Sequence, residues 1–305
     1  MTDRPFPEYA LTFEVLASVP RLEITETHFR SLEQDLSHID TYLDIEETWD
    51  SLLANYRALE LALAEMGVDN VLMGGGNTIH DFDDTRRTCT RLVDNMLTTA
   101  RAFLDKVPRR VRDLFGKEAQ ERFRLATNNA YDTYAGYKFM DNLRNYAQHH
   151  GSSISGVTYG VRRQEREGGL DALVHNAQIG IDRRPLDTEF KEHAREVLDR
   201  VSDKKGKIDM LPLIREYLQG LDEAMQVVRD SAKEPLEAWL SNNDDGVTKL
   251  AVASEFTVGQ VAVHYTERGT YGEKVYLHPT ARERIKRLRT RNRRLSHLTR
   301  SQIVS

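Results

Sequence analysis

An apolar pattern between residues 45 and 66 constrains the fold more than any other feature of the sequence. Apolar side chains recur there at alternating intervals of four and three residues, which places them along one face of a helix that packs lengthwise on another helix. The members of the pattern are Ile45, Trp49, Leu52, Tyr56, Leu59, Leu63 and Met66. Asp44 can cap the start of this helix, and Gly67 can end it. The pattern therefore predicts one long helix of a bundle.

Further helical patterns fill the rest of the first half of the chain. An earlier helix is expected over 27–43, and three consecutive glycines after the first long helix indicate a loop. A second long helix is expected over 85–107, where Pro108 stops it. A third helix carries an apolar face that includes Leu143, and Gly151 stands where a left-handed C-cap residue is expected.

The second half of the chain mixes two hydrophobic periods. Alternation of apolar and polar residues predicts a β-hairpin near 154–183 and strand-like segments within 247–278. Between them, helices are expected over 188–201 and 209–228, followed by a shorter helix that contains Trp239.

These patterns predict a mainly α fold class. We expect an up-and-down helical bundle with an inserted β-hairpin and a small C-terminal β element. The main domain is expected over 1–243, and the β element with a basic C-terminal helix over 244–305.

The composition excludes several classes of protein. With 39% hydrophobic and 30% charged residues, the 305-residue chain has enough apolar material for a sizeable core. It contains no run of about 18 apolar residues, so no membrane span is expected. Its N-terminus lacks the plan of a signal peptide, and Cys89 is the sole cysteine, which excludes a disulfide framework and a cysteine-based zinc site. A cytoplasmic location is expected.

Charge is distributed unevenly along the sequence. Residues 281–300 hold nine Lys or Arg and one Glu, a net charge of +8, so the remainder carries −13 of the total of −5. Three interpretations of this basic tail remain open: it binds a phosphate backbone, it docks on the acidic body of its own dimer or of another protein, or it is a solvated helix. The candidate nucleic-acid-binding residues are Arg284, Lys286, Arg287, Arg289, Arg291, Arg293 and Arg294.

The segment MDNLRNYAQHHGSS, residues 140–153, gathers basic groups at the end of the third long helix. Arg144 has a fixed charge and a planar fork of donors that matches a phosphate. His149 and His150 lie at the negative end of the helix dipole, which favours imidazolium, and Asn145 can orient a histidine or a substrate. RNA cleavage without a metal needs one group that moves a proton and another that stabilises charge on phosphorus.

Helix geometry separates these groups within one chain. Arg144 and His149 are five residues apart, which is about 140° around a regular helix. They converge only if the helix frays near His149 or if two copies of the chain meet across a two-fold axis. The second arrangement predicts a homodimer with a composite cleft.

The run RNYAQH, residues 144–149, resembles the signature of the HEPN superfamily, an arginine followed after a few residues by a histidine, with a polar residue directly after the arginine. The resemblance implies a helical bundle, usually dimeric, and a metal-independent ribonuclease that uses no cofactor, as in toxin–antitoxin and antiphage defence systems. It implies Arg144 and His149 as the catalytic pair, Asn145 as the supporting residue and His150 as the alternative at the next spacing. RNA is then the substrate, and an antitoxin or another regulatory protein is a candidate partner.

Three other interpretations remain open. Arg144 can pair with an acid while the histidines cover a helix end, which is a structural role. The chain can be a non-enzymatic helical scaffold that binds nucleic acid or a protein partner through its basic tail. Finally, His80, Asp81, Asp83 and Asp84 can hold a divalent metal, although the aspartates also suit the N-terminus of the second long helix.

Overall fold

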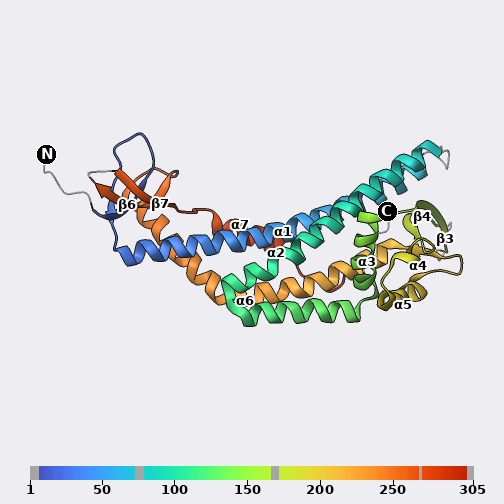
Figure 1. Cartoon of the computed structure of the whole chain (residues 1–305). Helices are drawn as coiled ribbons and strands as arrows, with labels where there is room; N and C mark the ends of the chain where they lie inside the picture. Colours follow the sequence, from blue (N-terminus) through green and yellow to red (C-terminus); the bar gives the residue numbers. More distant parts are fainter. Residues whose placement is uncertain (1–6, 73–78, 166–171, 268–269, 301–305) are drawn as a thin grey trace. The chain divides into compact units, whose positions relative to one another are not determined.

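The computed structural model of the chain describes residues 7–72, 79–165, 172–267 and 270–300. Within this part the chain is mainly helical, with seven α-helices and two small antiparallel sheets (Figure 1). The predicted mainly α class is therefore confirmed.

Three long helices carry much of the buried apolar surface: α1 (Glu26–Leu72), α2 (Ile79–Thr133) and α6 (Met210–Ala253). The 45–66 pattern is confirmed, because six of its seven side chains are buried and only Tyr56 is half-buried. Helix α2 likewise buries Cys89, Met96, Phe103 and Val107 along one face. Each such side chain contributes about 1.5–3 kcal/mol when it is fully buried.

The helix break expected between residues 43 and 45 is wrong, because α1 is one continuous helix. Leu43 and Ile45 are both buried, so the apolar face continues through the expected break. Asp44 is exposed and pairs with Arg110 of α2 instead of capping a helix. Gly67 is buried inside α1, which ends only at Leu72.

The expected bounds of the second long helix are also wrong. Helix α2 begins at Ile79 and passes through Pro108 without ending. A proline removes one backbone hydrogen bond, and here the buried Val107 and Val111 on either side hold the helix in place. The break comes at Gly116, whose φ of 87° and ψ of 176° require the conformational freedom of glycine.

Internal contacts divide the chain into two compact units. Unit 1 consists of Met1–Glu47, Arg110–Gly116 and Arg229–Asn292, and unit 2 consists of Thr48–Arg109, Lys117–Val228 and Arg293–Ser305. The domain boundary expected at residue 244 stays a prediction about which parts of the chain fold independently.

Unit 1 contains a four-stranded antiparallel sheet with the strand order β2-β1-β6-β7. Its elements are β1 (Tyr9–Phe13), β2 (Leu22–Glu23), β6 (Gln260–Glu267), β7 (Thr270–Tyr276) and the helix α7 (Ala281–Arg291). Leu11 of β1 lies opposite Ala262 of β6. The sequence patterns did not indicate β1, because all five of its residues are buried and no alternation marks the strand.

One strand expected in this unit is wrong. Residues 247–253 form the end of α6 and not a strand. Asn243, Gly246 and Leu250 are buried at helical spacing, and a Cβ on Gly246 would lie 3.2 Å from a methyl group of Leu277. The short apolar run VTKLAVAS fits both periods, and the contacts of α6 decide between them.

Unit 2 contains a three-stranded antiparallel sheet and three short helices, which gather at one end of the unit (Figure 1). They are β3 (Gly156–Gln164), β4 (Ala172–Asp182), β5 (Lys207–Asp209), α3 (Ala135–His149), α4 (Leu186–Glu189) and α5 (Glu192–Val201). The hairpin predicted near 154–183 is confirmed by β3 and β4. The single helix expected over 188–201 is two helices, because the extended and buried Phe190 separates α4 from α5 and packs on Phe139.

Two glycines let α3 approach α6 closely. Tyr134 is extended, with φ −99° and ψ 117°, and separates α3 from α2. A Cβ on Gly136 would lie 2.3 Å from the backbone oxygen of Leu213, and a Cβ on Gly220 would lie 2.7 Å from the ring of Tyr137. The close packing fixes the orientation of the helix that carries the RNYAQH run.

This packing gives a testable expectation. Gly136→Ala forces a methyl group into the backbone of α6, and we expect it to lower the free energy of unfolding by about 1–3 kcal/mol, although alanine favours helix. Gly156→Ala is the matched control, because nothing lies within 4 Å of a Cβ at that position. Urea unfolding followed by circular dichroism measures both, and equal stabilities would contradict the close approach of α3 to α6.

Candidate active site at the end of helix α3

Arg144 is held in place by a neighbour in the chain and by the core of unit 2. Its Nη1 donates a hydrogen bond to Oδ1 of Asn145, with a distance of 3.3 Å. The adjacent Leu143 is fully buried and anchors this face of α3. The Arg144 Nε is buried and has no hydrogen-bond partner among the residues that the structure describes. A buried donor without a partner lowers stability, because its desolvation is not compensated by a hydrogen bond.

The charge of Arg144 also acts on the core behind α3. Tyr217 of α6 is buried and packs edge-on against Tyr137, with ring centroids 4.9 Å apart. Burial raises the pKa of the Tyr217 hydroxyl, the hydroxyl of Tyr137 and the charge of Asp141 act in the same direction, and the Arg144 charge opposes them. Arg144 thus borders both the core and the surface of unit 2.

The two histidines at the end of α3 differ in their contacts. Nε2 of His150 lies 3.2 Å from Oε2 of Glu189 on α4, and its ring stacks on Tyr146 with centroids 6.2 Å apart. His149 is exposed and meets the His150 ring edge-on, with centroids 6.2 Å apart. His149 is therefore the imidazole that is more open to a substrate.

A single chain does not bring Arg144 and His149 together. Within residues 7–72, 79–165, 172–267 and 270–300, no hydrogen bond, ion pair or ring contact joins the two side chains. Helix α3 is regular as far as His149, so the fraying that would unite them in one copy is not seen. Within one copy, the two side chains therefore do not form a joint site.

The left-handed C-cap expected at Gly151 is wrong. Helix α3 ends at His149, and its C-cap residue is His150 with φ −129°, while the φ of Gly151 is not positive. Glycine is needed there for space, because a Cβ would lie 2.4 Å from the hydroxyl oxygen of Tyr146. The N–H of Gly151 donates to the backbone oxygen of Tyr146 at 3.3 Å.

Much of the basic tail is engaged with acids of unit 1. Glu46 of α1 is fully buried, and it accepts hydrogen bonds from Arg229 of α6 at 2.7 Å and from Arg289 of α7 at 3.2 Å. The Tyr42 hydroxyl donates to the same carboxylate at 2.5 Å. Burial, together with the Glu46 charge, raises the pKa of this hydroxyl. Arg289 therefore neutralises a buried charge of its own chain.

The other candidate tail residues divide into paired and open groups. Arg284 pairs with Glu47, and the neighbouring Arg282 pairs with Glu237 and Asp244, both at 2.7 Å. Lys286, Arg287, Arg293 and Arg294 are exposed and form no ion pair within the part that the structure describes, and Arg291 is exposed at the end of α7. The tail thus docks on α1 and α6 of its own chain and leaves part of its charge to the solvent.

The suggested metal cluster is only partly described. Asp83 and Asp84 lie in the first turns of α2 and pair with Arg86 and Arg87, whereas the side chains of His80 and Asp81 lie outside the described residues. In the described part of the chain, no group of three or more His, Cys, Asp or Glu residues is placed to hold a metal ion.

Cys89 and the tyrosines that precede the RNYAQH run are buried or half-buried. Burial raises the pKa of the Cys89 thiol to about 11, so the nucleophilic thiolate is scarce near neutral pH. Tyr137 is buried, and the Tyr134 hydroxyl donates to Glu223 at 2.6 Å. Tyr131 is half-buried and lines a cavity.

A second cavity, of about 600 Å³, lies beside the end of α3. Its lining includes Tyr146, Arg183, Arg184 and Lys205, none of which the sequence patterns indicated as site residues. The only signal was the pair of arginines directly after the second strand of the hairpin, and their position next to α3 depends on the tertiary fold.

Comparisons with protein-family models, with curated proteins and with solved structures find no match. Among the described helices, none combines the length with the apolar character that a membrane crossing requires.

The pairing of α7 gives a second testable expectation. Arg289→Met leaves the buried Glu46 with fewer donors, and we expect the free energy of unfolding to fall by about 2 kcal/mol. Lys286→Met, on the exposed face of the same helix, is the control and should leave the unfolding midpoint unchanged. Urea denaturation compares the variants, and an unaffected Arg289→Met protein would contradict a docked tail.

Proposed function

We propose that the chain is a metal-independent, HEPN-like endoribonuclease that acts as a homodimer with an up-and-down helical bundle in each copy. The observation that carries the proposal is the side-chain hydrogen bond from Arg144 to Asn145, which leaves the buried Nε of Arg144 without a partner in the described residues. The bond supports Asn145 as the residue that orients the guanidinium. His149, exposed one and a half turns later, supplies a titratable group.

The chemistry divides between these residues. Arg144 stabilises the charge that develops on the phosphorus oxygens, because its donors match a phosphate in a fixed plane. His149 acts as the general acid or base at the 2′-hydroxyl or the leaving oxygen. Since the two groups lie on different sides of one helix, Arg144 of one copy and His149 of its partner would form each cleft.

A biological role follows only by analogy with the family that the motif resembles. Cleavage of cellular RNA arrests growth, so we propose a toxin or antiphage effector in the cytoplasm, restrained by an antitoxin or another regulatory protein.

The alternative scaffold function relies on the basic tail, and the pairing of that tail weakens it. Arg284 and Arg289 are engaged with Glu47 and Glu46, so fewer charges remain for a partner than the sequence suggests. Truncation of the tail would also expose a buried carboxylate, and single substitutions at Lys286 or Arg287 are the cleaner test of that function.

The proposal leads to a third testable expectation. Purified protein with excess EDTA should cleave total RNA or transfer RNA, and His149→Ala should lower the rate by about a hundredfold or more, because it removes the proton-transfer group. Arg144→Ala should do the same. His297 follows Arg291 and Asn292 at a similar spacing in the tail, so His297→Ala is the matched control and should retain activity.

Thermal unfolding must be the same for all variants in this comparison. Full activity of a folded His149→Ala protein would exclude the assigned role, and loss of wild-type cleavage in EDTA would favour a metal-dependent enzyme.

A further inference from the structure

The cavity beside the end of α3 is large enough for a nucleotide. Its volume is about 600 Å³, within the range of small-molecule sites. Three elements meet there: the last turn of α3 with the segment after it, the end of β4 with the start of α4, and the turn before β5. All of them belong to unit 2, and the lining residue Tyr146 follows Arg144 by two positions in the sequence.

The cavity wall includes basic side chains that form no ion pair within the described residues. Asp182 pairs with Lys207 at 2.5 Å, and Asp187 pairs with Arg183 at 2.9 Å, so both lining carboxylates have a cationic partner. Arg183 is shared with Asp199, at 2.7 Å. Arg184 and Lys205 line the same cavity and form no ion pair within the described ranges.

The position of Lys205 is fixed by its backbone. Oδ1 of Asp203 accepts the N–H groups of Lys205 and Lys207, both at 2.8 Å. Gly206 takes a left-handed φ of 73°, and its carbonyl accepts the N–H of Arg183 at 2.9 Å. This turn therefore presents Lys205 beside the end of β4 in a built arrangement and not on a loose loop.

An aromatic ring faces the same space. Tyr146 lines the cavity and covers Gly151, and its ring is nearly parallel to that of His150, with an interplanar angle of 17°. Ser152 and Ser155 add hydroxyl groups to the lining. These two hydroxyls already donate to the backbone oxygens of Ile154 and Gly180. A stacking ring and cations without a carboxylate partner are groups with which proteins hold single-stranded nucleic acid.

We propose that this cavity binds one nucleotide of single-stranded RNA next to the cleaved bond. Tyr146 stacks on the base, and Arg184 and Lys205 bind its phosphate. This inference rests on the proposed ribonuclease function and adds to it a site that the RNYAQH motif does not contain. The inserted hairpin then has a function, because its second strand leads directly into the arginine pair.

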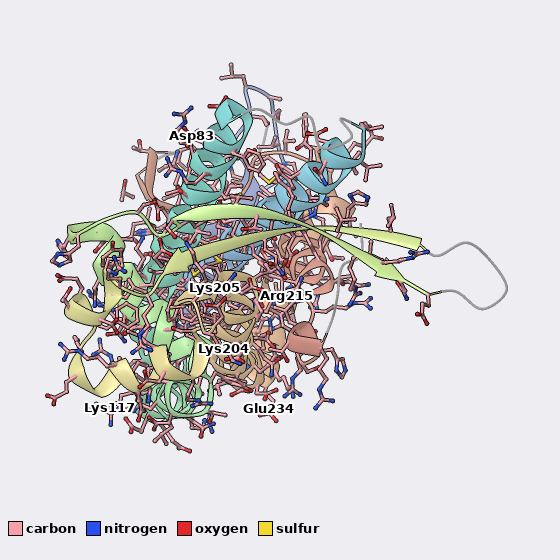
Figure 2. The ribbon with its side chains drawn as sticks, turned by 90° about the vertical axis from the view of Figure 1, so that its right-hand side faces the viewer. Asp83, Lys117, Lys204, Lys205, Arg215 and Glu234 are labelled. Atoms are coloured by element: carbon pink, nitrogen blue, oxygen red, sulfur yellow. The ribbon has the colours of Figure 1, made fainter. Side chains whose placement is uncertain are left out.

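Lys204 and Lys205 provide the sharpest test, since they are adjacent in the chain and both exposed, and only Lys205 lines the cavity (Figure 2 labels both). The probe is a fluorescent 2′-O-methyl RNA oligonucleotide, which lacks the 2′-hydroxyl needed for cleavage, so anisotropy reports binding alone. We expect Lys205→Ala and Arg184→Ala to weaken binding several-fold and to lower the salt slope by about 0.7 each, as for one lost phosphate contact to a single strand. Lys204→Ala should bind like the wild type.

A second variant addresses stacking. Tyr146→Leu removes the ring and should weaken binding about fivefold or more, with circular dichroism confirming the fold. Tyr146→Phe should bind nearly as well as the wild type, because the ring remains.

The outcomes separate this inference from the proposed function. Equal effects of Lys204→Ala and Lys205→Ala, or a mononucleotide that binds as tightly as the oligonucleotide, would overturn the RNA site. Oligonucleotide binding that depends on Lys205 and Tyr146, in a protein that cleaves no RNA, would support the cavity and refute the ribonuclease.

Discussion

A buried carboxylate of α1 that meets an arginine of α6 is the constraint on which each unit depends. In unit 2, Glu60 accepts two hydrogen bonds from Arg215, at 2.8 and 3.0 Å (Figure 2 labels Arg215). In unit 1, Glu46 accepts two hydrogen bonds from Arg229, one on each carboxylate oxygen. A tyrosine precedes each glutamate by four residues, and the two pairs are fourteen residues apart on both helices. Breaking such a pair costs about 3–5 kcal/mol, because an uncompensated charge stays buried, whereas the intact pair mainly specifies which residues face each other.

The position of the candidate active site follows from this register. Once Arg215 is held on Glu60, the adjacent turns of α6 present the backbone of Leu213 and of Gly220 to α3. The close contact at Gly136 then sets the rotation of α3, which brings Leu143 into the core and leaves Arg144 at its border. The same rotation places Tyr146 on the cavity and His149 in solvent. Helix packing thus determines which polar groups of the motif are accessible.

Local sequence patterns were sufficient to predict a helix or strand where the element buries one face. The 45–66 pattern, the hairpin and the tail helix all follow from periodicity. They were insufficient where distant contacts override local preference, as at Pro108, where buried valines continue the helix, and at residues 247–253, where Leu277 packs on Gly246. The strand at Tyr9–Phe13 is buried on both faces and lacks any period.

Only those residues of the candidate site that lie on helix α3 could be predicted from the sequence. The sequence placed Arg144, Asn145 and His149 near the end of a helix, and this placement is confirmed. The hydrogen bond from Arg144 to Asn145 was not predicted, because the sequence assigned Asn145 to a histidine or a substrate. The contact of His150 with Glu189 and the cavity around Lys205 join segments that lie about 40 to 60 residues apart, so no local spacing could indicate them. The charge of the tail was visible, but its partners on α1 and α6 were not.

The most direct test of the central claim mixes two inactive proteins. Arg144→Ala and His149→Ala subunits, each without cleavage activity alone, are unfolded, combined in equal amounts and refolded together. If every site takes its arginine from one copy and its histidine from the other, each mixed dimer regains one intact site, and about a quarter of the wild-type RNA cleavage should return. If cleavage stays absent although mixed dimers form, the two residues do not act across a two-fold axis, and the composite site is wrong.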